Sequence, residues 1–351
     1  MNSSHLSFYD QYIKSSVEQQ LSFMGEKAWD NLKDSHLLLT GATGFLGTWL
    51  LNLLHEAEKA HGLNLNIQIL SRNIERFFNR CPQFKNWPSL EALTGDVSTF
   101  DFSSCTPTHV ILGATSSNDR NLNSTKVIDS MLKSVDNPLR RINSSNLRHL
   151  MFLSSGAVYS NQKSGDKPFQ EECELSKTNH LPTTHYGKGK LVAEKHCLSW
   201  AKKNKIPCAI ARGFTFSGAY LMPSSGYALT DFIEHVHRHH SCPKPKGQLD
   251  TLRSYLDGAD AARHLWSLAI SRSNGVYNIG SQNITSIFTL VSKVCNEMKV
   301  PFDLNRDMAS NDTASQYLPN TKAFSTNHQS QQLVTLEQSI NHTAKWIKYI
   351  G

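Results

Sequence analysis

Tyr186 and Lys190 are the two side chains of this sequence best suited to proton transfer. Their spacing of four residues places them on one face of a helix. An ammonium group beside a phenol stabilises the phenolate and lowers the phenol pKa, so that the phenol can act as general acid and base. The apolar run 150–153 predicts a strand that ends in Ser154 and Ser155, at the sheet edge where open α/β folds bind ligands. Ser155, Tyr186 and Lys190 are the predicted catalytic residues.

A glycine-rich turn lies between an apolar run at 36–40, which predicts a strand, and a predicted helix that starts at Phe45. Glycines in this setting allow a tight turn and a close approach of the backbone to a pyrophosphate, which then lies at the positive helix N-terminus. The context favours dinucleotide binding over a purely structural turn. The predicted cofactor-binding residues of the turn are Gly41, Thr43, Gly44, Phe45, Leu46 and Gly47.

The end of the second predicted strand bears on the choice of cofactor. Folds that bind NAD usually have an acidic residue there for the ribose hydroxyl, whereas a nearby arginine accommodates the 2′-phosphate of NADP. In this chain the strand ends in Ser71, Arg72 and Asn73, with no carboxylate. The sequence therefore predicts NAD(P) and favours NADP over NAD. The alternative reading of Arg72 is a solvated surface cation.

Short apolar runs alternate with helix-like stretches along the first two thirds of the chain, which favours a parallel sheet covered on both faces. We predict an α/β fold: a Rossmann-type doubly wound parallel sheet with a smaller C-terminal α/β substrate-binding lobe. The predicted division is an N-terminal helical extension at 1–35, an NAD(P)-binding Rossmann domain at 36–215 to which 250–275 returns, and a substrate-binding lobe at 216–249 and 276–351.

Composition narrows the classes of partner. Lysine and arginine number 36 against 29 aspartates and glutamates, a net charge of +7 that favours anionic partners such as phosphates. The basic residues form only short mixed runs, so we expect no nucleic-acid partner. The seven cysteines contain no Cys-x-x-Cys pair and are typical of cytosolic thiols. Charges throughout residues 1–35 fit neither a signal peptide nor a membrane span, so we expect a cytoplasmic protein with no membrane partner.

Together these motifs resemble the extended short-chain dehydrogenase/reductase family, the NAD(P)-dependent epimerases and dehydratases of nucleotide sugars. The resemblance covers nearly the whole chain. Its landmarks are the turn at 41–47, Asp96-Val97, Gly113-Ala114-Thr115, Ser155 with Tyr159, Tyr186 with Lys190, Arg212-Gly213-Phe214-Thr215, Arg253-Ser254-Tyr255 and Tyr277-Asn278-Ile279-Gly280.

The resemblance implies a role for each site residue. Tyr186 exchanges the proton of a sugar hydroxyl, Lys190 lowers the Tyr186 pKa and holds the nicotinamide ribose, and Ser155 hydrogen-bonds the reacting oxygen. Arg253 contacts the substrate diphosphate, a task suited to the planar guanidinium. The implied substrate-binding residues are Ser155, Gly156, Thr215 and Arg253. The implied cofactor-binding residues beyond the turn are Ser71, Arg72, Asn73, Asp96 (to the adenine amine), Val97, Gly113, Ala114, Thr115, Tyr186, Lys190 and Phe214.

Departures from the family pattern bear on the reaction. Gly156 and Ala157 follow Ser155 where 4,6-dehydratases have Asp-Glu, so elimination lacks its acid/base pair. We therefore expect a nucleotide-diphosphate-sugar epimerase that acts by transient hydride transfer to bound NAD(P). The close alternative is an NADPH-dependent reductase of a 4-keto-6-deoxy nucleotide sugar, and a non-catalytic cofactor-sensing regulator is the alternative from a different class. Relatives often dimerise through Rossmann-domain helices, so a homodimer is expected.

A histidine cluster, His235, His237, His239 and His240 beside Arg238, raises the question of a metal site because imidazole is a common ligand. The expected chemistry needs no metal, and a polar helix end or loop is the commoner explanation. We predict no metal. The alternative for this cluster is a phosphate-facing role in the substrate lobe.

Overall fold

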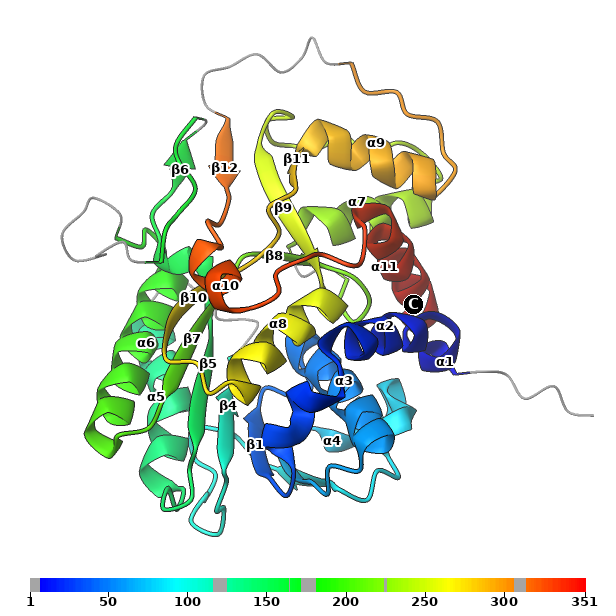
Figure 1. Cartoon of the computed structure of the whole chain (residues 1–351). Helices are drawn as coiled ribbons and strands as arrows, with labels where there is room; N and C mark the ends of the chain where they lie inside the picture. Colours follow the sequence, from blue (N-terminus) through cyan, green and yellow to red (C-terminus); the bar gives the residue numbers. More distant parts are fainter. Residues whose placement is uncertain (1–6, 116–124, 164, 172–180, 224–225, 306–313) are drawn as a thin grey trace, which may run out of the picture.

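A seven-stranded parallel sheet forms the centre of the molecule, with strand order β10-β7-β5-β4-β1-β2-β3 (Figure 1). The structure is a computed structural model that describes residues 7–115, 125–163, 165–171, 181–223, 226–305 and 314–351. The predicted α/β fold class is confirmed. The strands are β1 (His36–Thr40), β2 (Asn66–Ser71), β3 (Leu90–Thr94), β4 (His109–Leu112), β5 (His149–Ser155), β7 (Cys208–Gly213) and β10 (Gly275–Ile279).

Helices cover both faces of this sheet, and the strand sequences explain why. Successive side chains of a strand point to opposite faces. Leu37 and Leu39 of β1 join the core formed with α3 (Phe45–His61) and α8 (Gly258–Ile270), whereas Leu38 joins the core formed with α5 (Thr125–Arg141) and α6 (His185–Asn204). Because both faces are buried, β1 is apolar at consecutive positions rather than at alternate ones.

The strand order reverses at β1, which lies between β2 and β4. The chain builds the sheet outward in one direction through β3 and then crosses to the other side at β4. Ligands of open α/β sheets bind beyond the carboxyl ends of the strands at such a reversal. The glycine turn at 41–47 directly follows β1, so the topology places it at this point.

A smaller sheet and its helices form the second lobe. Strands run in the order β11-β9-β12-β6, with β8 paired to β9, and three helices pack together around a separate apolar core. The elements are β6 (Gln162–Lys163), β8 (Thr215–Ser217), β9 (Leu252–Asp257), β11 (Ile284–Ser286), β12 (Ser315–Tyr317), α7 (Ala228–His239), α9 (Ile287–Glu297) and α11 (Leu336–Ile350).

The predicted division is wrong at one boundary. Residues from 276 onward were assigned to the substrate lobe, but β10 pairs in parallel with β7 at the edge of the large sheet, from Gly275↔Ala209 to Ile279↔Gly213. The cause is long-range pairing: the chain passes through the lobe and returns to the sheet for this strand. The other predicted boundaries stay predictions.

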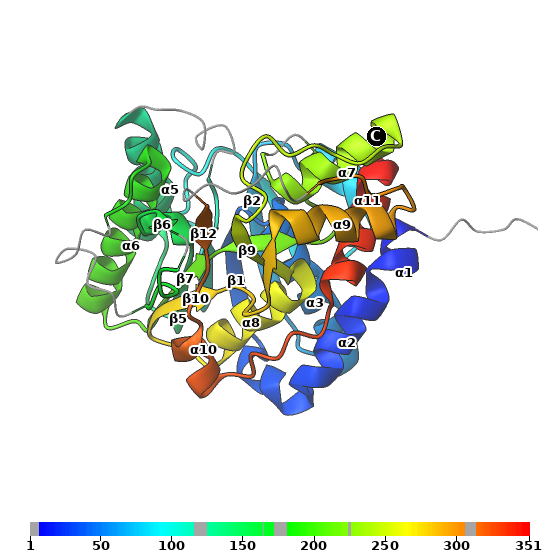
Figure 2. The same cartoon turned by 90° about the horizontal axis from the view of Figure 1, so that it is seen from above.

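The N-terminal segment, which the sequence predicts to be helical, forms helices that pack on the large domain. They are α1 (Phe8–Tyr12), α2 (Lys14–Met24) and η1 (Glu26–Leu32). The helices α2 and η1 pack on α3 and α8, and Figure 2 shows α1 beside α11. Short elements elsewhere are α4 (Ile74–Arg80), η2 (Pro82–Phe84), η4 (Gly156–Val158) and α10 (Lys322–Asn327).

Among the described helices none is long and apolar enough to cross a membrane. Six cysteines are buried and unpaired, and Cys173 lies outside the described residues.

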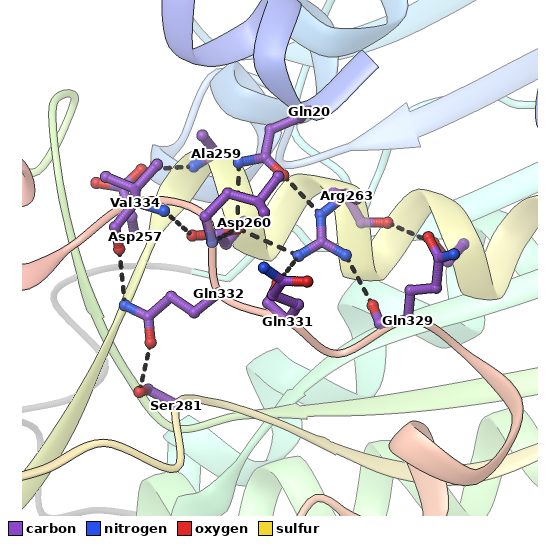
Figure 3. A network of polar contacts seen from close by, with 12 residues as sticks. Gln20, Asp257, Ala259, Asp260, Arg263, Ser281, Gln329, Gln331, Gln332 and Val334 are labelled. Carbon is purple, nitrogen blue, oxygen red and sulfur yellow. Dashed lines mark hydrogen bonds and ion pairs between the residues drawn. The ribbon is translucent and has the colours of Figure 1, made fainter. Parts of the chain in front are cut away.

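A buried polar network fastens this N-terminal segment to the chain that leads into α11 (Figure 3). Asp260 Oδ1 accepts hydrogen bonds from Gln20 Nε2 at 3.1 Å and from Leu333 N at 3.0 Å. Arg263 donates to Gln20 Oε1 at 2.6 Å and to the Gln329 carbonyl at 2.7 Å, and lies 3.2 Å from Asp260. Buried charges are costly unless they are paired and hydrogen-bonded, and here each is. The network therefore joins three segments that are distant in sequence.

Two buried histidines make the fold sensitive to acid. His109 and His149 begin neighbouring strands, with ring centroids 6.4 Å apart. Burial is the largest cause that lowers the pKa of His109 to about 3 and that of His149 to about 4. An unfolded histidine titrates near pH 6.5. Below that pH the unfolded chain takes up protons that the folded chain does not, so stability present above pH ~6.5 is lost as the pH falls toward ~4.

We predict that His109→Gln flattens this pH dependence. The free energy of unfolding, measured with urea between pH 7.5 and 4.5, should lose up to about 1.4 kcal/mol per pH unit of its slope. His240→Gln is the control, because His240 is exposed at the end of α7 and should leave the slope unchanged. Equal slopes in both variants would contradict the assignment.

Candidate functional site

A cavity of about 1240 Å³ lies at the carboxyl end of the large sheet, between that sheet and the second lobe. Pockets for a single small ligand are usually about 300–1000 Å³. The cavity is therefore larger than is usual for one small ligand. Its wall includes the glycine turn after β1, the ends of β2, β4 and β5, the start of α6, and side chains of β9 and β12.

Nearly every residue predicted from the sequence lines this one cavity. Gly156 does not: a Cβ there would lie 2.4 Å from the Tyr317 hydroxyl oxygen, so the Tyr317 ring covers it. The predicted residues that line the cavity are Gly41, Thr43, Gly44, Phe45, Leu46, Gly47, Ser71, Arg72, Asn73, Asp96, Val97, Gly113, Ala114, Thr115, Ser155, Tyr186, Lys190, Phe214, Thr215 and Arg253.

The glycine turn has the geometry of a cradle for a phosphate group. Gly41 has φ +75°, and a Cβ there would lie 2.4 Å from the Gly113 carbonyl carbon. A Cβ on Gly47 would lie 2.4 Å from Ala42 Cα. No side chain caps the start of α3, whose first residues line the cavity. The first N–H groups of a helix have no partner within the helix and attract anions. The turn thus fits the pyrophosphate of a dinucleotide.

Tyr186 and Lys190 lie on the first turns of α6, next to the end of β5. Lys190 is 3% exposed, donates to the Leu153 carbonyl at 2.8 Å, and its Nζ lies 6.0 Å from the centroid of the Tyr186 ring. Gly187 explains the close approach of α6, because a Cβ there would lie 2.0 Å from the Ala157 carbonyl oxygen. The structure therefore brings the predicted triad to one place.

A buried ion pair lies directly behind these residues. Glu194 is one turn beyond Lys190 on α6, and Arg212 of β7 donates to its carboxylate at 2.7 and 3.0 Å. Ser154 donates to the same carboxylate at 2.5 Å. Arg212 also donates to the Tyr159 hydroxyl at 2.8 Å, which in turn donates to Asn278 Oδ1 at 2.9 Å. The pair joins α6, β5, β7 and β10.

Arg253 brings an uncompensated positive charge to the lobe side of the cavity. Its Nη1 donates to the Leu252 carbonyl at 2.8 Å, and among the described residues no carboxylate forms an ion pair with it. Burial is the largest cause that lowers its pKa, and the nearby hydroxyls of Tyr255 and Tyr317 oppose that effect. A half-buried guanidinium without a protein counter-ion is suited to bind an anion.

Sequence reasoning missed Tyr317. Tyr317 pairs with Arg253 where β12 runs beside β9, and its ring lies 4.6 Å from that of Phe214. Burial raises the pKa of the Tyr317 hydroxyl, and a hydrogen bond with Ser155 opposes that rise. No local signal marks this tyrosine, because only the pairing of β12 with β9 brings it to the site.

Glu194 was also missed, although a signal was present. The residues Tyr186, Lys190 and Glu194 are each four apart, which places all three on one helix face. A carboxylate on the same helix face as a proposed catalytic pair is a candidate for a residue that positions the pair.

The histidine cluster lies away from this cavity. The rings of His235 and His239 are 4.7 Å apart at the end of α7, and His237 and His240 line a separate pocket with Lys345 and Lys348 of α11. Within the part of the chain that the structure describes, no group of three or more His, Cys, Asp or Glu side chains could hold a metal ion. None of these four histidines lines the main cavity.

The family model for the NAD dependent epimerase/dehydratase family matches residues 37–280. The chain belongs to this family. The predicted resemblance is therefore confirmed, and the match spans the glycine turn, the Tyr186–Lys190 pair and Arg253.

Solved structures of similar fold include nucleotide-sugar enzymes. A UDP-glucuronic acid 4-epimerase from Bacillus cereus is 18% identical with a TM-score of 0.74, over 90% of this chain and 100% of that one. A UDP-N-acetylglucosamine 4-epimerase from Methanobrevibacter ruminantium is 18% identical with a TM-score of 0.72, over 91% and 100%. A dTDP-glucose 4,6-dehydratase from Bacillus anthracis is 16% identical with a TM-score of 0.72, over 90% and 97%. No curated protein sequence matches the chain.

The ion pair behind the site yields a stability prediction. Glu194→Met leaves Arg212 buried without its counter-ion, so the free energy of unfolding in urea should fall by about 3–5 kcal/mol. The double variant Glu194→Met/Arg212→Met removes both charges and should recover a large part of that loss. Arg238→Met is the control, because Arg238 pairs with Glu234 at the surface, where such a pair contributes at most about 1 kcal/mol. A loss in Glu194→Met no larger than in the control would contradict this role.

Proposed function

We propose that the protein is a nucleotide-diphosphate-sugar epimerase that acts by transient hydride transfer to NAD(P) bound in the main cavity. One observation carries the proposal: Ser155, Tyr186 and Lys190 lie in a single cavity between a glycine turn that fits a pyrophosphate and an arginine that fits a second anion. The 4-epimerases among the structures of similar fold support the same reading.

In such a reaction Ser155, Tyr186 and Lys190 have different roles. NAD(P), which the glycine turn at 41–47 would hold, would supply the acceptor, and later the donor, of a hydride for a sugar carbon. Tyr186, as the phenolate that Lys190 stabilises, takes the proton of the hydroxyl on that carbon and becomes the neutral phenol. Ser155 donates a hydrogen bond to the oxygen that becomes a carbonyl. Once the keto-sugar has turned over, Tyr186 would return the proton to the sugar oxygen, which regenerates the phenolate and completes the epimer.

Arg253 is proposed to hold the substrate diphosphate, because it is the half-buried cation on the lobe side of the cavity. Holding the diphosphate leaves the sugar free to turn, which inversion requires.

The acidic residues favour epimerisation or reduction over elimination. Among the described residues that line the cavity, Asp96 is the one carboxylate, and it accepts hydrogen bonds from the Ser98 backbone and hydroxyl at 2.9 and 2.6 Å. It lies in the loop after β3, with Arg72 nearby. Gly156 and Ala157, which follow Ser155, supply no acid or base for loss of water.

The second candidate is an NADPH-dependent reductase of a 4-keto-6-deoxy nucleotide sugar. Three arginines, Arg72, Arg76 and Arg80, line the cavity beside the end of β2. Their charge suits the 2′-phosphate of NADP, which a reductase would consume. We further propose that the protein is cytoplasmic, which its scattered cysteines favour, and homodimeric, as the family resemblance suggests.

Turnover of sugar nucleotides separates the two reactions. Proton NMR of the protein with UDP-, dTDP-, GDP- and CDP-sugars should show a new anomeric signal without net consumption of NADPH. Tyr186→Phe should slow the reaction by about 100-fold or more, because the proton acceptor is lost. Tyr277→Phe is the matched control, since among the described residues its hydroxyl donates only to the Asn274 carbonyl, at 3.4 Å, and Tyr277 does not line the cavity.

Turnover of keto-sugars alone, with stoichiometric loss of NADPH, would identify a reductase instead. Unchanged turnover in Tyr186→Phe would refute the catalytic assignment. If none of the sugar nucleotides reacts, the result would favour a cofactor-sensing regulator.

Cofactor choice gives a separate prediction. In Arg72→Ala the Kd for NADPH should rise by about tenfold, the loss of one charge-assisted hydrogen bond, while the Kd for NADH stays the same. Fluorescence titration of both nucleotides measures this. Arg148→Ala is the control, because Arg148 is exposed and precedes β5 at the opposite edge of the sheet. Tighter binding of NADH than of NADPH by the unaltered protein would overturn the preference for NADP.

A further inference from the structure

The loop at 218–222 has an unusual backbone. Gly218 has φ +111°, and two residues later Tyr220 has φ +72°. Bulky residues rarely adopt positive φ, because the Cβ approaches the neighbouring carbonyl groups. Such a conformation persists only where the surroundings hold it. The contacts of Tyr220 are therefore of interest.

The Tyr220 side chain is held on several sides. It is 3% exposed, and its ring centroid lies 5.4 Å from that of Trp49 and 4.9 Å from that of Trp346, both edge-on. Asn52 Nδ2 donates to the Tyr220 hydroxyl at 3.1 Å, and Gln83 fixes the orientation of that amide by donating to its oxygen at 3.0 Å. The side chain thus has one position.

The backbone of the loop is held as well. Trp49 Nε1 donates to the Ala219 carbonyl at 3.0 Å, and Gly218 N donates to the Thr343 hydroxyl of α11 at 3.0 Å. Trp49 and Asn52 belong to α3, the helix that begins at the glycine turn. One helix therefore positions both the turn and the loop.

The loop lies beside the glycine turn at the wall of the cavity. Tyr220, Leu221 and Met222 line the cavity. Arg80 reaches both sides, with Nη2 donating to the Thr43 carbonyl at 2.5 Å and Nη1 lying 3.6 Å from the Met222 sulfur. A displacement of the loop would open the cavity at its glycine-turn end.

The N-terminal helix supports this arrangement from behind. The ring of Phe8 on α1 lies 5.3 Å from that of Trp346, the same ring that packs against Tyr220. Phe8 is 7% exposed and does not line the cavity. The three rings Phe8, Trp346 and Tyr220 form a continuous contact from the N-terminal segment to the wall of the site.

We infer that Tyr220 is a positioning residue for the dinucleotide, and that the N-terminal helix α1 supports it through Phe8 and Trp346. The inference rests on the proposed binding of NAD(P) in the main cavity. With Phe8 in place, Trp346 keeps Tyr220 at its unusual φ, and Leu221 and Met222 close the cavity beside the glycine turn. When the Phe8 ring is removed, the loop at 218–222 leaves this conformation, and the affinity for the dinucleotide falls.

Affinity for NADPH and for NADH, measured by fluorescence titration, tests this. Phe8→Leu should raise the Kd of the better-bound nucleotide by about fivefold, a size typical of substitutions that act through packing. Phe8→Tyr keeps the ring and should bind as the unaltered protein does. Phe23→Leu is the matched control: it lies on the same N-terminal segment, but its ring faces Arg263, 4.7 Å away, and it should leave the Kd unchanged.

A second variant separates backbone from side chain. Glycine adopts positive φ without strain. If residue 220 mattered only for its backbone, Tyr220→Gly would bind the nucleotide normally; we expect it to weaken binding at least as much as Phe8→Leu does. Urea unfolding midpoints for each variant show that the titrations are made on folded protein.

The outcomes separate the two proposals. Binding by the unaltered protein, with equal Kd values in Phe8→Leu and Phe23→Leu, would overturn the role of α1 and leave the proposed function intact. Normal binding by Tyr220→Gly would overturn the role of the Tyr220 ring. Failure of the unaltered protein to bind either nucleotide would overturn the proposed function and this inference with it.

Discussion

The buried pair of Arg212 and Glu194 is the interaction on which the site depends. The two side chains are 6% and 2% exposed, so neither charge is compensated by water. Removing one partner would leave an isolated charge in the interior, which is far more costly than a lost surface contact. Because Glu194 lies on α6 and Arg212 on β7, the pair allows only one register between that helix and the sheet. The helix carries Tyr186 and Lys190, so their position follows from this register.

Two successive turns of α6 form hydrogen bonds with two successive residues at the end of β5. Glu194 accepts from Ser154, and Lys190 donates to the Leu153 carbonyl. At the cavity the same helix packs Gly187 against the Ala157 carbonyl. Three contacts along one helix fix its rotation and its height above the sheet. Tyr186 needs such a fixed position, because proton transfer requires its hydroxyl to lie within hydrogen-bond distance of the substrate and slows when it is displaced.

The sequence could predict features that depend on neighbouring residues. It could not predict features that depend on pairing between distant strands. The run at 36–40 with the glycine turn, and the pair Tyr186 and Lys190, are read within a few neighbouring residues, and the structure brings them to one cavity. The assignment of 276–279 to the lobe failed because a strand's sheet is set by its partner, here β7. Tyr317 could not be found for the same reason: its place depends on the pairing of β12 with β9. Gly156 was expected at the cavity wall, and the unforeseen Tyr317 ring covers it.

The position of α3 joins the cofactor side of the cavity to the ends of the chain. Its first turn presents N–H groups to the cavity, and its next turns carry Trp49 and Asn52, which hold the loop at 218–222. That loop packs on Trp346 of α11, and Trp346 packs on Phe8. Coupling between a ligand and a distant segment is reciprocal at equilibrium. If α1 favours the closed position of the loop, a dinucleotide that binds this position must stabilise the docking of α1 by the same free energy. The N-terminal segment is therefore coupled to the occupancy of a site that none of its described residues lines.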